Sequence, residues 1–334
     1  MKSTRLSVCI LVACTIAVAM WTAGASAQTP APTLHWNAGD INGNGTGADN
    51  PADGASVTSW VDSAGGQDAT EATDAPVFVQ VDADFNSQPV VRFDGGQILT
   101  APDDSIYDVP DKVGYTAFVV AAVGENGDSP PAVFYDHREG GGGGFRGQTL
   151  FLEARTPGAT SDGSGVGMTL GAQVNTPASV IGYNTPADNF PGGNGSANPL
   201  VPDEFEDDVA RIYSVVFDRD DTDGDGASVH FGIDSLATIL GAKDDGTSPA
   251  PPLGVSEAGA NFTIGHGPNF GGGSIRLHGR IAEILIFHSE LSVADQTSVL
   301  NGLGAAYNIA IVPEPSTCVL VLLGALGMIA YRRR

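Results

Sequence analysis

Cysteine is scarce in this sequence, and the long middle part of the chain has none. Of three cysteines in 334 residues, Cys9 and Cys14 lie near the start and Cys318 lies near the end. No disulfide can therefore form within residues 28–312, which must be stabilised by packing or by a bound metal. The short zinc, redox and hydrolase motifs H-E-x-x-H, C-x-x-C and G-x-S-x-G are also missing, so the sequence gives no support for these chemistries.

Positive charge is also scarce. Residues 28–312 hold 10 Lys and Arg against 38 Asp and Glu. Binding to nucleic acid is disfavoured, because neutralising phosphates requires cations. Adhesion to anionic lipid is disfavoured for the same reason. An acidic surface of this kind favours solubility and association with cations.

Segments with helical periodicity are few. Instead, short apolar and β-branched runs alternate with Gly, Asp, Asn and Pro, which is typical of an all-β sandwich or barrel. The strands predicted from these runs are Val57–Val61, Pro89–Phe93, Tyr115–Val123, Ala132–Tyr135, Thr149–Glu153, Ile212–Phe217, Val229–Ile233, Phe262–Gly265 and Arg280–Phe287.

One stretch, which ends at Tyr307, predicts a helix packed on or beside the sandwich. Ser292 is a suitable N-cap, and the side chain of Asp295 stands where it can hydrogen-bond back to Ser292, as in a capping box. Apolar residues then recur at helical spacing, at positions Val293, Val299, Leu300 and Leu303.

The first 27 residues have the pattern of a secretory signal peptide. Two cations precede an apolar run, Leu6–Trp21, and the small residues Ala25 and Ala27 form an A-x-A exit. We expect an apolar signal helix that is cleaved after Ala27. A lipid-attachment motif ending at Cys14 is the alternative, but the apolar run continues beyond that cysteine.

The chain end combines three features in a fixed order: a Pro-Glu-Pro triplet, an apolar run (Cys318–Tyr331) and a cluster of arginines. The apolar run has 14 residues and is short for a spanning helix. By the positive-inside rule the arginines would stay cytoplasmic. The residues of the triplet and the cluster are Pro313, Glu314, Pro315, Arg332, Arg333 and Arg334.

This end resembles the bacterial PEP-CTERM sorting signal. The resemblance implies recognition by an exosortase-type processing enzyme near the triplet, and export associated with extracellular polysaccharide. It divides the chain into a signal peptide at 1–27, a domain at 28–312 and a sorting tail at 313–334. A plain C-terminal anchor is the alternative.

The domain itself resembles LamG-like, concanavalin A-like jelly-roll modules. The similarity lies in Leu34–Ala38, Asp53–Gly65, Asn86–Gly95, Tyr115–Val123 and Gly279–Phe287, and in the helix that follows. It implies an all-β jelly-roll sandwich with one short helix near the C-terminus. In such folds Trp36 and Trp60 are expected in the core. Members are mostly binding or adhesion modules, while relatives of the broader fold include glucanases and proteins that bind sugars or calcium.

Glucanase chemistry would require paired carboxylates on one face of a strand. A Glu-x-Asp-x-x-Glu motif is absent. The cluster of acidic residues before the predicted strand Ile212–Phe217 has the pattern of a solvated loop. We therefore expect that the chain is not an enzyme. The clustered acids are Glu204, Glu206, Asp207 and Asp208.

Two loops carry oxygen ligands at alternating positions that suit calcium. The first holds Asp221, Asp223 and Asp225, but a glycine stands where an EF-hand would place its closing Glu. A hairpin turn explains this loop equally well, since Asp and Gly favour turns.

The second loop, with Asp40, Asn42 and Asn44, has fewer charges and a proline at the closing position. A surface turn is again the simpler interpretation.

The sequence therefore predicts an exported protein of the cell envelope or its polymer matrix. The leading hypothesis is that the domain is a non-enzymatic binding or adhesion module that recognises carbohydrate and binds calcium. The alternatives are a glycan-active enzyme and a purely structural matrix protein. Membrane contact is expected through the tail only, and nucleic acid is not expected as a partner.

Overall fold

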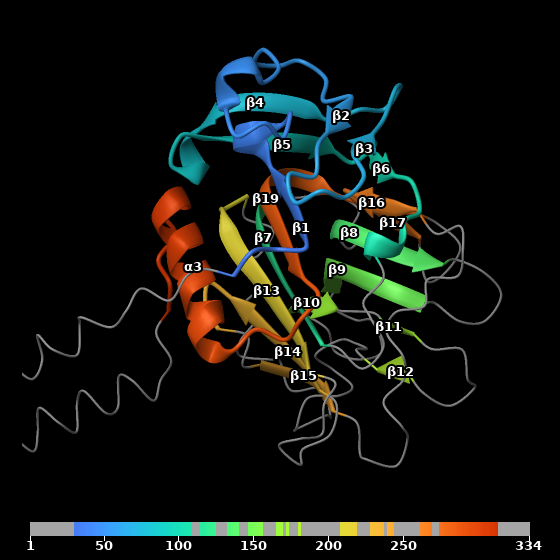
Figure 1. Ribbon diagram of the computed structural model, residues 1–334, viewed down its shortest axis with the longest axis vertical. Helices are drawn as coiled ribbons and strands as arrows, with labels where there is room; N and C mark the ends of the chain where they lie inside the picture. Colours follow the sequence, from blue (N-terminus) through green and yellow to red (C-terminus); the bar gives the residue numbers. More distant parts are fainter. Residues whose placement is uncertain are drawn as a thin grey trace, which may run out of the picture.

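The computed structural model describes residues 30–107, 114–124, 132–139, 146–155, 165–169, 172–173, 180–181, 208–218, 228–236, 239–243, 261–268 and 274–312. The predicted signal helix and the predicted C-terminal hydrophobic helix lie outside these ranges. No helix within them is long and apolar enough to cross a membrane. The described chain forms two stacked β-sheets and one helix of several turns (Figure 1).

The first sheet has eight antiparallel strands. Strand β1 (Leu34–Asn37) and strand β5 (Gln88–Asp94) both pair with the same edge of β19 (His278–Phe287), one after the other along its length. The order of the seven strands other than β1 is β15 (Ile239–Lys243), β14 (Ser228–Ile233), β13 (Arg211–Asp218), β7 (Tyr115–Val123), β19, β5 and β4 (Val77–Asp82).

The second sheet has seven strands, several of them very short. The described residues also form two small hairpins and four 3-10 helices outside the two main sheets. The sheet order is β10 (Gly165–Thr169), β9 (Arg146–Arg155), β8 (Ala132–Glu139), β16 (Phe262–Ile264), β6 (Leu99–Ala101), β3 (Ala69–Thr70) and β2 (Ser59–Trp60). The hairpins are β11 (Ala172–Gln173) with β12 (Val180–Ile181), and β17 (His266–Pro268) with β18 (Ser274–Arg276); the 3-10 helices are η1 (Ala38–Asp40), η2 (Gly47–Asp49), η3 (Ala83–Phe85) and η4 (Ser105–Tyr107).

The main core lies between the two sheets. Trp36 and Trp60 are fully buried there, which confirms that both are core residues. The Trp36 ring stacks on Phe262 with centroids 4.9 Å apart. The indole N–H of Trp60 donates to the Asn37 carbonyl at 3.2 Å, so the polar edge of that ring is satisfied inside the core.

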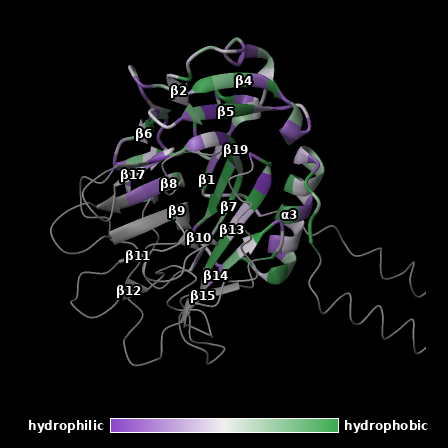
Figure 2. Cartoon of the chain, turned by 180° about the vertical axis from the view of Figure 1, so that it is seen from behind, coloured by the Kyte–Doolittle hydropathy of each residue, from purple (hydrophilic) through white to green (hydrophobic). Residues whose placement is uncertain are grey.

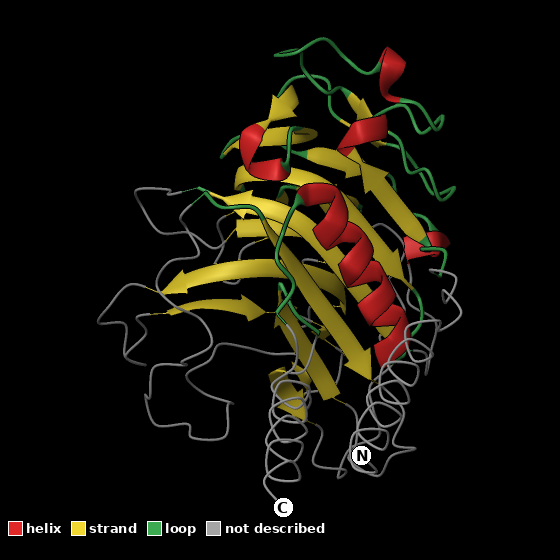
Figure 3. Ribbon diagram, turned by 90° about the vertical axis from the view of Figure 1, so that its left-hand side faces the viewer, coloured by secondary structure: helices red, strands yellow, loops and turns green. Residues whose placement is uncertain are grey.

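A second core lies on the outer face of the first sheet, under helix α3 (Val293–Tyr307) (Figure 3). Strand β7 is buried along its whole length because the second sheet covers one face and α3 the other. Apolar residues are accordingly concentrated along β7 (Figure 2). The structure therefore confirms the predicted all-β sandwich with one short helix near the C-terminus.

The N-cap of α3 forms as predicted, since Ser292 Oγ accepts the backbone N–H of Asp295 at 3.2 Å. Val299, Leu300 and Leu303 face the sheet. The prediction was wrong for Val293, which is 61% exposed in the first turn of the helix.

Stability should depend on pH through His288, which follows β19. Burial, and secondarily the charge of His137, lowers the pKa of His288 to about 4. The unfolded chain therefore binds the proton more tightly, and stability is lost as pH falls from the ordinary histidine value toward 4. Between pH 6.5 and 4.5 we expect His288→Leu to lose about 2 kcal/mol less stability than the wild type in urea denaturation. Equal losses in both proteins would contradict this assignment.

Candidate functional site

Glu283 occupies a β-bulge in the middle of β19. Ile281 pairs with Ala121 and Glu283 pairs with Val120, so Ala282 is an extra residue in the strand. Side chains alternate between faces, and the bulge shifts this alternation by one position. As a result Glu283 faces outward with Val120, toward α3, instead of inward with Ile281.

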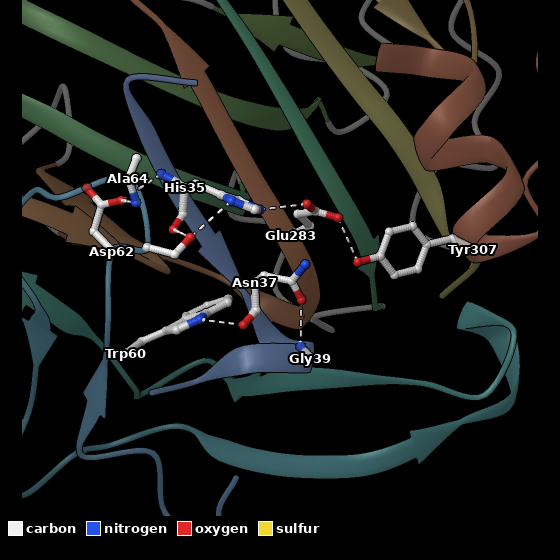
Figure 4. A network of polar contacts seen from close by, with 9 residues as sticks. His35, Asn37, Gly39, Trp60, Asp62, Ala64, Glu283 and Tyr307 are labelled. Atoms are coloured by element: carbon white, nitrogen blue, oxygen red, sulfur yellow. Dashed lines mark hydrogen bonds and ion pairs between the residues drawn. The ribbon is translucent and has the colours of Figure 1, made fainter. Parts of the chain in front are cut away.

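The Glu283 carboxylate accepts two hydrogen bonds from opposite sides (Figure 4). The phenol of Tyr307, on the last turn of α3, donates to Oε2 at 2.8 Å. His35 Nε2, on β1, lies 2.7 Å from Oε1. Burial raises the pKa of Tyr307 well above its ordinary value, and the Glu283 charge adds to the effect, so the phenol stays protonated as a donor.

The other ring nitrogen of His35 continues this network. Ser63 Oγ lies 3.0 Å from His35 Nδ1. The neighbouring carboxylate of Asp62 accepts the backbone N–H groups of His35 at 2.8 Å and Ala64 at 2.9 Å. Burial raises the pKa of Asp62, and these N–H donors oppose that rise. Hydrogen bonds of this network thus connect β1 with β19, with the loop after β2 and, through Glu283, with α3.

Glu283 and Tyr307 line a cavity of about 310 Å³. It lies where the edge partner of β19 changes from β5 to β1, between the loop that follows β1, the start of β5 and the end of α3. Three glycines, Pro89 and Ala306 also line it. We call it the Glu283 cavity; its polar side chains are Asn37, Asp40, Thr46, Gln88, Glu283 and Tyr307.

A second cavity, of about 260 Å³, lies beside Arg280. The Arg280 guanidinium binds Asp82 at 2.6 Å, Asp84 at 3.0 Å and Asp208 at 2.9 Å, and it lies over the Phe85 ring. Burial alone would lower the pKa of Arg280, but its hydrogen bond and charge interaction with Asp82 raise the pKa above the ordinary value. The other charged or titratable residues that line this cavity are Arg92, Asp94 and His278.

Of the four clustered acids that we expected in a solvated loop, only Asp208 is among the residues that the structure describes. Asp208 is half exposed, and its carboxylate pairs with Arg280. Glu204, Glu206 and Asp207 lie outside the described residues.

The second of the predicted calcium loops is held by its own hydrogen bonds. Asp40 accepts the backbone N–H groups of Asn44 at 3.0 Å and Gly45 at 2.7 Å. The side-chain amide nitrogens of Asn42 and Asn44 each donate to Asp49, both at 2.7 Å. In the described part of the chain, no group of three or more His, Cys, Asp or Glu is placed to hold a metal.

The first predicted calcium loop, with Asp221, Asp223 and Asp225, lies outside the described residues. Calcium binding by either loop stays a prediction. It can be tested by comparing the melting temperature with calcium and with a chelator, since a ligand that binds only the folded state raises that temperature.

A family model described as the PEP-CTERM protein-sorting motif matches residues 312–334. The protein is therefore exported, transiently anchored in the membrane by its tail and processed by an exosortase-type system. No curated protein is similar to this chain in sequence.

The chain is similar to several solved structures at low identity. A Trypanosoma rangeli sialidase in complex with sialic acid is 15% identical, with a TM-score of 0.41 over 84% of this chain and 34% of that one. The same enzyme as a covalent intermediate with difluorosialic acid is 13% identical, with a TM-score of 0.43 over the same shares. An arabinofuranosidase bound to arabinofuranosyl-xylobiose is 13% identical, with a TM-score of 0.40 over 72% of this chain and 45% of that one.

This chain spans about a third of the length of the sialidase. The expectation that it is not an enzyme is contradicted, because the similar solved structures are glycoside hydrolases. At TM-scores near 0.4, however, the similarity carries no argument for a particular activity. The LamG-like resemblance is not confirmed.

The hydrogen bond between Tyr307 and Glu283 should contribute to stability. Tyr307→Phe leaves a buried carboxylate oxygen without its donor, so we expect the free energy of unfolding to fall by about 1–3 kcal/mol. A double-mutant cycle with Glu283→Gln, measured by urea denaturation, isolates the pair. Additive effects in this cycle would show that the two side chains do not interact.

Proposed function

We propose that the exported β-sandwich binds extracellular carbohydrate in the Glu283 cavity. The observation that carries this proposal is a buried, hydrogen-bonded carboxylate and phenol that open onto a polar cavity of about 310 Å³. This volume lies at the lower end of the range for small-molecule sites. Carboxylate and amide side chains are suited to sugars, because hydroxyl groups both donate and accept hydrogen bonds.

The shape of the site supports this use. The Glu283–Tyr307 pair is fixed from two sides, by α3 and by His35, so its acceptor atoms are positioned before a ligand arrives. The cavity is lined by the loop after β1 and by residues of β5, β19 and α3, whose relative positions are set by the two cores. The sorting tail supports exposure of the site to the polysaccharide outside the cell.

The test is a glycan array followed by calorimetric titration of the processed protein. We expect Glu283→Gln to weaken binding about tenfold to a hundredfold, the range of a hydrogen bond to a charged group. Glu71→Gln is the matched control, because Glu71 is a partly exposed loop carboxylate whose hydrogen bonds stay within its own turn and which does not line the cavity. Product analysis of bound glycans reveals any hydrolysis. No binding to any glycan would leave a structural matrix role instead.

A further inference from the structure

The Glu283 cavity contains more hydrogen-bond acceptors than donors. Each oxygen of Glu283 already accepts one bond, and a carboxylate has about four acceptor positions, so acceptor capacity remains. The Tyr307 proton is used by Glu283, which leaves the phenol oxygen as an acceptor. Asp40 likewise accepts one backbone N–H on each carboxylate oxygen. A ligand that fits must therefore donate hydrogen bonds.

The charged side chains described in the lining of the Glu283 cavity are both acidic. Asp40 and Glu283 line it, and no Lys, Arg or His is among the described residues of its lining. His35 reaches Glu283 from β1 but is not part of the lining. Arg280 lies in the second cavity, where three aspartates already surround it. An anionic ligand would thus meet two carboxylates without a compensating cation.

The cavity also offers two amide groups at its rim. Asn37 uses its oxygen to accept the N–H of Gly39 at 2.6 Å, which directs the NH₂ group to other partners. Gln88 is exposed at the start of β5. A carboxylate that accepts hydroxyl hydrogens, beside amides that donate to hydroxyl oxygens, complements a sugar with neighbouring free hydroxyl groups.

We infer that the Glu283 cavity selects neutral glycans and discriminates against glycans that carry carboxylate or sulfate groups. This inference rests on the proposed carbohydrate function and adds the ligand class. Two like charges a few ångströms apart near a protein surface repel strongly enough to weaken binding at least about tenfold.

The test is calorimetric titration of the processed protein at pH 7 with trimers of glucose, galactose and mannose, and with trimers of the corresponding uronic acids. We expect at least one neutral trimer to bind about tenfold or more tightly than its uronic acid counterpart. Asp40→Asn and Glu283→Gln each remove one negative charge and should narrow that ratio, whereas Glu71→Gln should leave it unchanged. Using two variants keeps the test valid if one of them folds poorly.

The outcomes separate the two proposals. Equal or tighter binding of a uronic acid trimer would overturn the ligand class and leave the carbohydrate function standing. A ratio unchanged in both charge-removing variants would also overturn the ligand class. If none of the six trimers binds, and the glycan array is also blank, the proposed function itself fails.

Discussion

Replacing Arg280 with methionine is expected to lower the free energy of unfolding by about 3–5 kcal/mol, the cost of breaking a buried ion pair from one side. The Asp82 carboxylate is 7% exposed and lies 2.6 Å from the guanidinium. Without Arg280 this carboxylate would stay buried without a cation, and only the backbone N–H of Asp84 would still donate to it. Asp84 and Asp208 are half exposed, so water can replace their contacts and they contribute little to the loss.

Arg92→Met is the matched control for this experiment. Arg92 lies 3.1 Å from Asp94, but both side chains are 46% exposed. An exposed pair of this kind contributes about 0–1 kcal/mol. Urea denaturation of the two variants at pH 7 should therefore give clearly different losses. Similar small losses in both would show that Arg280 does not stabilise the outer face of the first sheet.

Replacing all three residues of the Pro-Glu-Pro triplet with alanine is expected to abolish processing of the tail. The motif match covers residues 312–334, and the folded sandwich reaches up to it, since the Val312 N–H donates to the Asp234 carbonyl at 2.7 Å. The unprocessed chain should remain in the membrane fraction through Cys318–Tyr331. Intact mass and fractionation of the exported protein measure both effects.

Ser316→Ala is the control for the triplet, because it changes the adjacent residue and leaves the triplet, the apolar run and the arginine cluster intact. It should be processed like the wild type. If the alanine triplet variant loses its tail as fast as this control, the triplet is not what the processing enzyme recognises.

The sequence predicted the fold best where burial alone determines the structure. Tyr115–Val123 was predicted with its observed bounds, because a strand covered on both faces has a continuous apolar run. The predicted Arg280–Phe287 strand begins two residues earlier in the structure, at a histidine and a glycine. Strand β4 was not predicted, because it is an edge strand in which only Phe78 and Asp82 are buried.

Asp40 was named from the sequence, as a calcium ligand, and it lines the candidate site. The pairing of Glu283 with Tyr307 was not predicted, because it depends on register. Whether Glu283 faces the sandwich interior or α3 is decided by the bulge at Ala282, and the register is visible only once β7 is paired with β19. Tyr307 has the pattern of an ordinary core residue of a helix. The one signal in the sequence was a single carboxylate within the apolar run of β19, since such a residue needs a polar partner when buried.

A crystal structure of the processed protein with a neutral oligosaccharide tests the Glu283 cavity most directly. We expect a sugar ring between the loop after β1, the start of β5 and the end of α3, with a hydroxyl group within hydrogen-bond distance of Glu283. The bond between Glu283 and Tyr307 should be preserved in that complex. A sugar bound elsewhere on the sandwich, with the Glu283 cavity holding only water, would contradict the proposed function.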